Sequence, residues 1–298
     1  MKRTLLALTS LMMLLAACQP ADLNAPAPVF ETGADSEAWA EIPAGEFFHG
    51  QFDEQASIDY DYEMMVFDVT NAQYAAFLNA AVADGSATVE QNQVTGYYAG
   101  EPFDGGRHEE EINAGKTIYI PLNDSALRLD FDGTTFSAKT EWADHPMTMV
   151  SWFGAKAYCE YYGWRLPTEM EWEKAARGTD NRPFPWGEVI ARNNANYYFS
   201  RDPFEDMNAY GSRTTPVGFY NGKTYAGYQT LDSASPYGLY DMAGNVWQWT
   251  ADDYPLTHYR YMRGGGSNSY ENNLRIWSRN SAAPGFYGPA LGFRCARP

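Results

Sequence analysis

The segment GLYDMAGNVWQW, Gly238–Trp249, combines features that ordinary globular sequence rarely combines, and the fold can be read outward from it. Trp247 and Trp249 lie two positions apart, so an extended backbone would point both indoles to the same side. The preceding run Ala243-Gly244-Asn245 can supply the positive φ of a tight turn. The pattern predicts two large aromatic anchors beside an irregular loop.

The composition is aromatic-rich and acidic. The 298 residues suit one larger domain or two small ones, and 45% hydrophobic with 16% aromatic residues is ample for a core. Nine Trp and 22 Tyr indicate a loop-rich protein packed by aromatic side chains and not a helical bundle. The net charge of -17 argues against nucleic acid as a partner, because phosphate neutralisation needs a basic stripe that no segment offers.

Residues 1–18 have the pattern of a bacterial lipoprotein signal peptide. Two basic residues precede an apolar run that is too short for a transmembrane helix, and Leu15-Ala16-Ala17-Cys18 places small residues before a cysteine. The resemblance to lipoproteins implies that Cys18 is acylated and anchors the chain in the cell envelope, facing the periplasm or the cell surface. Gln19 after it favours the outer membrane over the inner one. A plain secretory signal is the competing interpretation.

The first part of the mature chain predicts a tether followed by a strand and a helix. Residues 19–37 are rich in Ala, Pro, Asp and Glu and are expected to form a flexible tether. Residues 42–47 predict an opening strand and turn, and the alternation over residues 60–64 predicts the next strand. Thr70-Asn71-Ala72-Gln73 is a capping box, so the first helix should run over 71–82.

Two further helices are predicted in the middle of the chain. Ser151 is a good N-cap for one of them, and Thr168-Glu169-Met170-Glu171 is a second capping box, with Gly178 as the stop. The residues expected on the buried faces are Trp152, Ala155, Tyr158, Cys159, Trp172, Ala175 and Ala176. The two glutamates invite an acid/base interpretation, but capping and the helix dipole explain them.

Five motifs outside the opening segment complete a pattern that resembles one known family. They are RLPTEMEWEKAARG at 165–178, PWG at 185–187, PVG at 216–218, RGGGS at 263–267 and GFRC at 292–295. In order and approximate spacing they resemble the formylglycine-generating enzyme family, the sulfatase-modifying factor domain, from about Ile42 to Arg297. The resemblance implies one α+β, loop-rich domain over 38–298 with a C-type-lectin-like fold.

Residues 83–143 form an insertion relative to the compact family pattern. Asp132-Gly133, between LRLDF and TTFSA, predicts a hairpin. Glu109-Glu110-Glu111 is an acidic cluster in a Gly-flanked stretch, and a solvated loop explains it better than a metal site.

Three cysteines less the lipidated one leave Cys159 and Cys295, an even number in an oxidising compartment. A disulfide is the economical interpretation, and the resemblance implies a structural disulfide at these positions. Two separately buried thiols are the alternative.

Two calcium sites are implied by the resemblance. The first set is Asn196, Tyr197, Asp202 and Phe204, and the second is Asp241, Gly244, Val246 and Gln248. Side-chain and carbonyl oxygens of this kind suit Ca²⁺, although a capping aspartate in a core turn also explains Asp241. The family usually has a carboxylate where Gln248 stands, so the second site should be the weaker.

The catalytic chemistry of the family is not expected here. The four histidines His49, His108, His145 and His258 are isolated, with no zinc-ligand spacing, and there is no CxxC, GxSxG or Walker loop. Active members of the family carry two copper-binding cysteines after the Gly-Gly-Ser motif, and these positions fall on Tyr270 and Arg275. A soft copper site needs thiolates, so copper is not expected and catalytic residues stay unknown.

Candidate groove residues are Trp247, Ser267, Tyr270, Arg275, Trp277 and Arg279. Trp247 and Ser267 match positions that line the substrate groove in the family, whereas the two later arginines can equally pair with acidic loops.

Two functions remain open. In one, the chain is an extracytoplasmic lipoprotein that uses the groove and the segment Asn268–Tyr287 to bind a peptide, glycan or protein. In the other, it is a periplasmic oxidase that modifies a protein or metabolite by cysteine-independent chemistry. Whether the chain is an enzyme is left open at this point.

Overall fold

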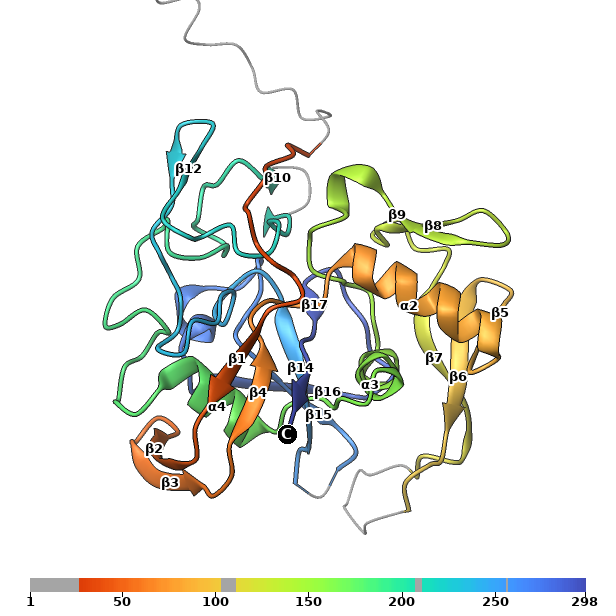
Figure 1. The fold of residues 1–298 in the computed structure, drawn as a ribbon, viewed down its shortest axis with the longest axis horizontal. Coiled ribbons are helices and arrows are strands. Elements are labelled where there is room, and N and C mark those ends of the chain that lie inside the picture. The colour runs from red at the N-terminus through yellow and green to blue at the C-terminus, as the bar shows by residue number, and fades with distance from the viewer. Residues whose placement is uncertain (1–26, 103–110, 207–210, 256) are drawn as a thin grey trace, which may run out of the picture.

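The computed structural model describes residues 27–102, 111–206, 211–255 and 257–298, and Figure 1 shows short strands and long connections with three α-helices among them. The described strands are β1 (Trp39–Ile42), β2 (Gly45–His49), β3 (Glu54–Ile58), β4 (Tyr62–Met65), β5 (Ala87–Glu90), β6 (Gln93–Tyr98), β7 (Gly115–Pro121), β8 (Leu129–Phe131), β9 (Phe136–Ala138), β10 (Glu205–Asp206), β11 (Gly211–Ser212), β12 (Thr224–Tyr225), β13 (Tyr228–Gln229), β14 (Trp247–Asp253), β15 (Arg260–Arg263), β16 (Arg279–Ala282), β17 (Leu291–Gly292) and β18 (Ala296–Arg297). The helices are α2 (Asn71–Asp84), α3 (Trp152–Tyr161) and α4 (Glu169–Arg177), with 3-10 turns η1 (Thr140–Trp142) and η2 (Glu271–Leu274). No helix within these ranges has the length and apolar character needed to cross a membrane.

The strand β14 lies in the sheet β16-β15-β14-β17, antiparallel to β15 and parallel to β17. Trp247 and Trp249 pack against the same hydrophobic core, which confirms their expected same-side placement. Gln248, between them, faces Trp172 of a second core. The turn before the strand has φ of +86° at Gly244 and +64° at Asn245, as predicted.

The first core lies between α2, α3 and β14. Both predicted caps are confirmed: Thr70 and Gln73 form the capping box of α2, and Ser151 Oγ accepts the N–H of Gly154. The helix α2 runs two residues past the predicted Val82 and ends at Gly85 in the left-handed region. A disulfide joins Cys159 of α3 to Cys295, as expected.

The second core lies between α4 and the antiparallel sheet β1-β4-β18. The hairpin β2–β3 lies beside it and is absent from the sequence prediction, which expects one strand and turn over 42–47. In the structure Ile42 ends β1 and Gly45 begins β2. Tyr60 lies outside β4 and is exposed, so the predicted strand over 60–64 begins at Tyr62.

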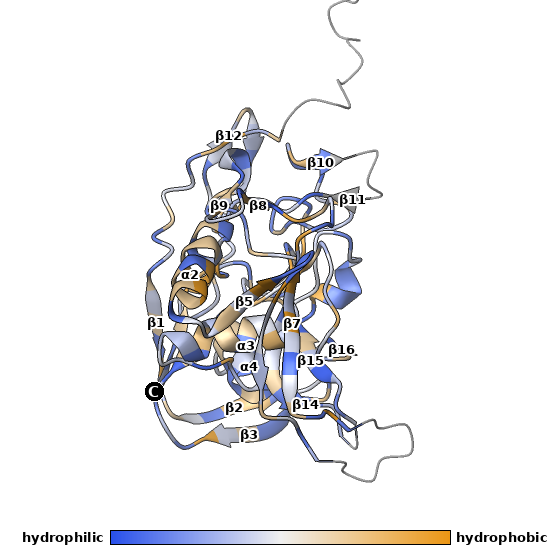
Figure 2. Cartoon of the chain, turned by 90° about the vertical axis from the view of Figure 1, so that its right-hand side faces the viewer, coloured by the Kyte–Doolittle hydropathy of each residue, from blue (hydrophilic) through white to orange (hydrophobic). Residues whose placement is uncertain are grey.

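The insertion over 83–143 contributes the three-stranded sheet β5-β6-β7, which packs on α2 and α3. The hairpin β8–β9 is confirmed, and the Asp132 carboxylate accepts the N–H groups of Thr134 and Thr135 in its turn. Glu109 and Glu110 lie outside the described residues, while Glu111 is exposed. In Figure 2 the orange, apolar segments gather in the interior around α2, α3 and the strands that cover them.

The expected tether over 19–37 requires a correction. Its described part packs against the domain, because the Phe30 ring contacts Phe204, Phe219 and Tyr225 and Ala27 is buried beside them. The compact part of the chain therefore includes Ala27.

Candidate functional site

The segment 264–278 joins β15 to β16 and carries four of the six predicted groove residues. Its two ends meet, because Arg263 and Arg279 are opposite each other in the antiparallel register. Gly265 has φ of +73°, and a Cβ there would lie 3.0 Å from the carbonyl oxygen of Asn273. The glycine therefore permits the segment to fold back closely on itself.

Backbone hydrogen bonds fix Trp247, at the start of β14, and Ser267, on segment 264–278. The Ser267 N–H donates to the Asn245 carbonyl at 2.8 Å, and the Trp247 N–H donates to the Ala290 carbonyl at 2.9 Å. A Cβ at Gly266, between them, would approach Trp247 Cδ1 at 3.4 Å. Ser267 is buried, however, so its hydroxyl lies below the protein surface.

Tyr270 belongs to an exposed group of three rings, which we call the aromatic surface: Tyr198, Phe199 and Tyr270. Their exposed fractions are 39%, 45% and 55%. The Tyr270 ring centre lies 4.9 Å from that of Tyr198 and 5.8 Å from that of Phe199. The Tyr198 N–H donates to the Ser269 carbonyl at 3.0 Å, which fixes one segment against the other. Sequence reasoning missed Tyr198 and Phe199, although the consecutive aromatics at 197–199 were a signal.

The remaining three predicted groove residues, Arg275, Trp277 and Arg279, are not part of the aromatic surface. The Arg275 guanidinium is 5.8 Å from the centre of the Trp277 ring, and the Arg177 guanidinium is 5.4 Å from the same centre. Arg275 forms no ion pair with a residue in the described ranges. Arg279 pairs with Glu169 of α4, so an acidic partner explains Arg279 better than a groove does.

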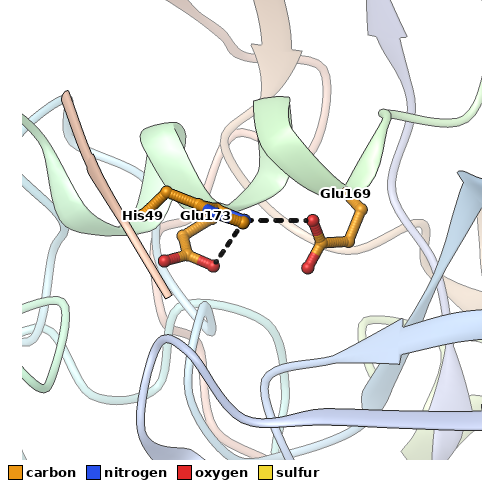
Figure 3. A group of neighbouring side chains, drawn as sticks. All are labelled: His49, Glu169 and Glu173. Carbon is orange, nitrogen blue, oxygen red and sulfur yellow. Dashed lines mark hydrogen bonds and ion pairs between the residues drawn. The ribbon is translucent and has the colours of Figure 1, made fainter. Parts of the chain in front are cut away.

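Arg279 enters a cluster of ionisable groups, some buried and some partly exposed, which we call the ion cluster. Its members are His49 of β2, Asp53, Glu169, Glu173 and Arg177 of α4, Arg263 of β15 and Arg279 of β16. Figure 3 shows His49, Glu169 and Glu173 converging, with His49 Nε2 3.3 Å from Glu169 Oε2 and 3.6 Å from Glu173 Oε2. Glu169 and Glu173 are four residues apart on one helix and therefore share its face.

The guanidinium of Arg263 is the centre of the ion cluster. It donates to Glu169 Oε1 at 2.8 Å, to Glu173 and to the Ile276 carbonyl at 2.7 Å. Burial alone would raise the pKa of Glu169, but the contact with His49 and the charges of Arg263 and Arg279 lower it to about 2. The cluster thus anchors both ends of segment 264–278 on α4. Sequence reasoning assigned Glu169 to capping and missed Glu173.

The first predicted calcium set is buried, and part of it is already hydrogen-bonded. Asp202 accepts from Ser200, Tyr220 and the Phe204 N–H at 2.7 to 2.9 Å. Asn196 Oδ1 is buried without a hydrogen-bond partner among the described residues, and such an oxygen suits a cation. The set stays a prediction, with Asn196 as the residue that fits it.

The second set fits a calcium ion less well. Gln248 Oε1 accepts from Trp172 Nε1 at 2.7 Å and from Arg294 Nε at 2.9 Å, so protein donors already use it. Asp241 accepts the Gly218 N–H at 2.7 Å, and burial raises the pKa of its carboxyl to about 6. We derive no role for a cation at this set.

A cavity of about 710 Å³ lies away from the predicted groove, between α3 and the end of β14. None of the predicted groove residues lines it. Its basic residues are paired: Lys156 with Glu160, Arg165 with Glu171, and Arg260 with Glu101 and Asp253.

Comparisons with known proteins identify the domain type. The family model described as "Sulfatase-modifying factor enzyme 1-like domain" matches residues 27–298. The chain is 35% identical over 175 residues to serine/threonine-protein kinase pkn1 of Chlamydia caviae, which covers 52% of this chain and 24% of that protein. It is 35% identical over 165 residues to inactive C-alpha-formylglycine-generating enzyme 2 of Bos taurus, covering 52% and 51%. It is 30% identical over 296 residues to formylglycine-generating enzyme of Bos taurus, covering 86% and 73%.

The chain therefore spans about a quarter of the length of the first of these relatives and about half of the second. Among solved structures, PvdO from Pseudomonas aeruginosa has a TM-score of 0.57 at 21% identity, with 92% of this chain and 99% of that one covered. At that identity the likeness concerns the fold. The single α+β domain of this type, predicted from the sequence, is confirmed.

Proposed function

The chain belongs to the sulfatase-modifying factor family, and from this premise we propose that it is an extracytoplasmic lipoprotein that binds a polypeptide without the family's copper oxidase chemistry. Oxidation of a substrate cysteine by this route needs two thiolates beside the groove. The proposal assigns the chain a binding role on the same segment, 264–278.

The proposal rests on the two positions where the family resemblance places the copper ligands. Tyr270 and Arg275 occupy them. The phenol of Tyr270 is on the surface against Tyr198, and Arg275 stacks on Trp277. Neither side chain supplies a thiolate for a soft metal. Cys159 and Cys295 are bonded to each other, which leaves no free thiol among the described residues. A relative at 35% identity that carries the name "inactive" supports this interpretation.

The aromatic surface supports a binding role. Contiguous exposed apolar groups, unlike single ones, are a feature of interaction sites. Asn268, Asn272 and Asn273 are exposed on the same segment. Tyrosine with asparagine and serine is the composition of protein-binding surfaces that combine rigid rings with adaptable hydrogen bonds.

The extracytoplasmic location rests on Cys18 and on the disulfide. A disulfide persists in oxidising compartments, which supports export of the chain. Metabolic labelling with an alkyne fatty acid tests the anchor: label should enter the wild-type protein and be absent from Cys18→Ser. Equal labelling of both proteins would contradict the lipid anchor.

A cysteine-oxidation assay tests the loss of catalysis. The purified protein is incubated with copper, oxygen and a peptide carrying Cys-x-Pro-x-Arg, and the cysteine mass is followed. We expect no conversion to the aldehyde, with an active formylglycine-generating enzyme as positive control. Conversion by the wild-type protein would overturn the proposal and favour cysteine-independent oxidation.

A phage-displayed peptide library tests the binding role. Peptides should be enriched on the wild-type protein and lose their binding to Tyr270→Ala. A glycan array is probed with the same two proteins. Glycan binding without peptide enrichment would refute a polypeptide ligand.

A further inference from the structure

We propose that His49, Glu169 and Glu173 form a site for a divalent transition metal ion such as Zn²⁺, and that the guanidinium of Arg279 competes with the ion for these ligands. The inference concerns the ion cluster alone and does not depend on the proposed binding function.

The spacing of the three donor atoms suits a zinc ion. His49 Nε2 lies 3.3 Å from Glu169 Oε2 and 3.6 Å from Glu173 Oε2, and all three atoms lie within 4.8 Å of one another. Ligands at zinc distances of about 2.1 Å and tetrahedral angles lie about 3.4 Å apart. Small side-chain adjustments therefore bring all three donors to one ion, as their convergence in Figure 3 suggests.

Hydrogen bonds from the protein orient both carboxylates through their Oε1 atoms. Arg263 donates to Glu169 Oε1, and the Gly50 N–H donates to Glu173 Oε1 at 2.7 Å. Glu169 Oε2 faces His49, and Glu173 Oε2 faces His49 while it also accepts from Arg263. Hydrogen bonds to the outer oxygens of metal-binding carboxylates orient the inner ones and are a regular feature of metal sites.

The Arg279 guanidinium presents His49 with a contact in which its ring nitrogen accepts. The Arg279 guanidinium lies 2.7 Å from His49 Nε2. A guanidinium can only donate, so in this contact Nε2 accepts and carries a lone pair. An unprotonated ring nitrogen is the form that binds metal ions.

Charge and exposure single out Arg279 as the competitor. Three carboxylates, of Asp53, Glu169 and Glu173, face three guanidinium groups in the ion cluster. The side chains of Arg177 and Arg263 are fully buried, whereas that of Arg279 is 35% exposed. Arg279 can therefore move into water, and its departure leaves one uncompensated negative charge that favours a cation.

Metal titration of the untagged, full-length protein after chelator treatment tests the site. We expect one Zn²⁺ per chain by calorimetry, and visible absorption bands of coordinated Co²⁺. His49→Ala should abolish both signals. If Arg279 occupies the ligands for nine-tenths of the time, Arg279→Gln should lower the apparent Kd about tenfold.

The matched control is His258→Ala, because His258 lies 3.7 Å from Glu101 in a second histidine–glutamate pair. This variant should bind Zn²⁺ as the wild-type protein does. Circular dichroism establishes that each variant is folded. The proposal is overturned if neither the wild-type protein nor folded Arg279→Gln binds Zn²⁺, or if folded His49→Ala binds it unchanged.

Discussion

In two places in this domain, acidic side chains lie beside arginines. The pKa of the carboxyl group is lowered in one place and raised in the other. In the ion cluster, the pKa of Glu169 is lowered to about 2 by His49, Arg263 and Arg279 against the effect of burial. Beside the turn of segment 238–249, burial raises the pKa of Asp68 to about 8, although Arg294 lies 3.2 Å away. Both groups are buried, so burial alone does not explain the difference.

The difference lies in the charges around each carboxyl, since Asp241 raises the pKa of Asp68 while His49 and two arginines lower that of Glu169, and in where the arginine N–H groups point. Arg263 directs its N–H groups at Glu169 and Glu173. Arg294 directs its own at Gln248 Oε1 and at the carbonyls of Met65, Val66 and Tyr240. The Asp68 oxygens accept no hydrogen bond from the described residues. The direction of each pKa shift thus follows the balance of hydrogen bonds and charges around the carboxyl, and one guanidinium near Asp68 is not enough to keep it ionised.

The largest expected effect comes from breaking the well-paired group. Glu173→Gln leaves the buried guanidinium groups of Arg177 and Arg263 short of one counter-charge. We expect a loss of about 3–5 kcal/mol in the free energy of unfolding, measured by urea denaturation.

Glu63→Gln is the matched control, because Glu63 pairs with Arg297 where both side chains are partly exposed. It should cost about 1 kcal/mol or less. Equal losses for the two variants would show that pairing in the ion cluster has no special weight in stability.

The second expected effect is a dependence of stability on pH. Because the folded pKa of Asp68 is raised from 3.8 to about 8, its contribution is complete below pH 3.8 and is lost as the pH rises toward 8. Asp241, raised to about 6, acts in the same direction over a narrower range. Glu169, lowered from 4.5 to about 2, contributes above pH 4.5 and loses its contribution as the pH falls toward 2.

The Tm of the wild-type protein should therefore fall from about pH 6.5 to about pH 8, which calorimetry can measure. Below pH 6.5 the buried His145, whose pKa is lowered to about 3, acts in the opposite direction. Asp68→Asn cannot ionise, so its Tm should fall less above pH 6.5. A wild-type Tm that rises, or an unchanged slope in Asp68→Asn, would contradict the assignment.

Local features of the fold could be predicted from the sequence because their causes are local. The turn at Gly244 and Asn245 and the caps at Thr70 and Thr168 each depend on residues a few positions apart. The ion cluster could not be predicted in this way. Its contacts join α4 to Arg263 and to His49, across segments far apart in the chain, and these become neighbours only through the strand pairings.

One of the three residues of the aromatic surface was predicted, for the same reason. Tyr270 was marked by its position after the glycine run, but its neighbours come from residues 198 and 199, which the Tyr198–Ser269 hydrogen bond brings alongside. Phe30 shows the opposite error, since proline and alanine around it suggested a tether although its ring finds a core.

The smallest expected effect on stability comes from Tyr270, which lies on the same segment as the anchored residues but outside the ion cluster. Tyr270 is 55% exposed. Within the described part of the chain its ring contacts only the rings of Tyr198 and Phe199, so truncation to alanine removes few contacts. We expect Tyr270→Ala to change the free energy of unfolding by about 0.5 kcal/mol or less in urea denaturation.

This result, set beside Glu173→Gln, separates the two parts of segment 264–278. Stability should reside in its anchored ends, where Arg263 and Arg279 meet α4, and its exposed residues, 268 and 270–273, should be free to vary for recognition. A loss for Tyr270→Ala as large as that for Glu173→Gln would place the aromatic surface in the stabilising core. The absence of peptide binding in that variant would then follow from unfolding and would no longer support a role for Tyr270 in recognition.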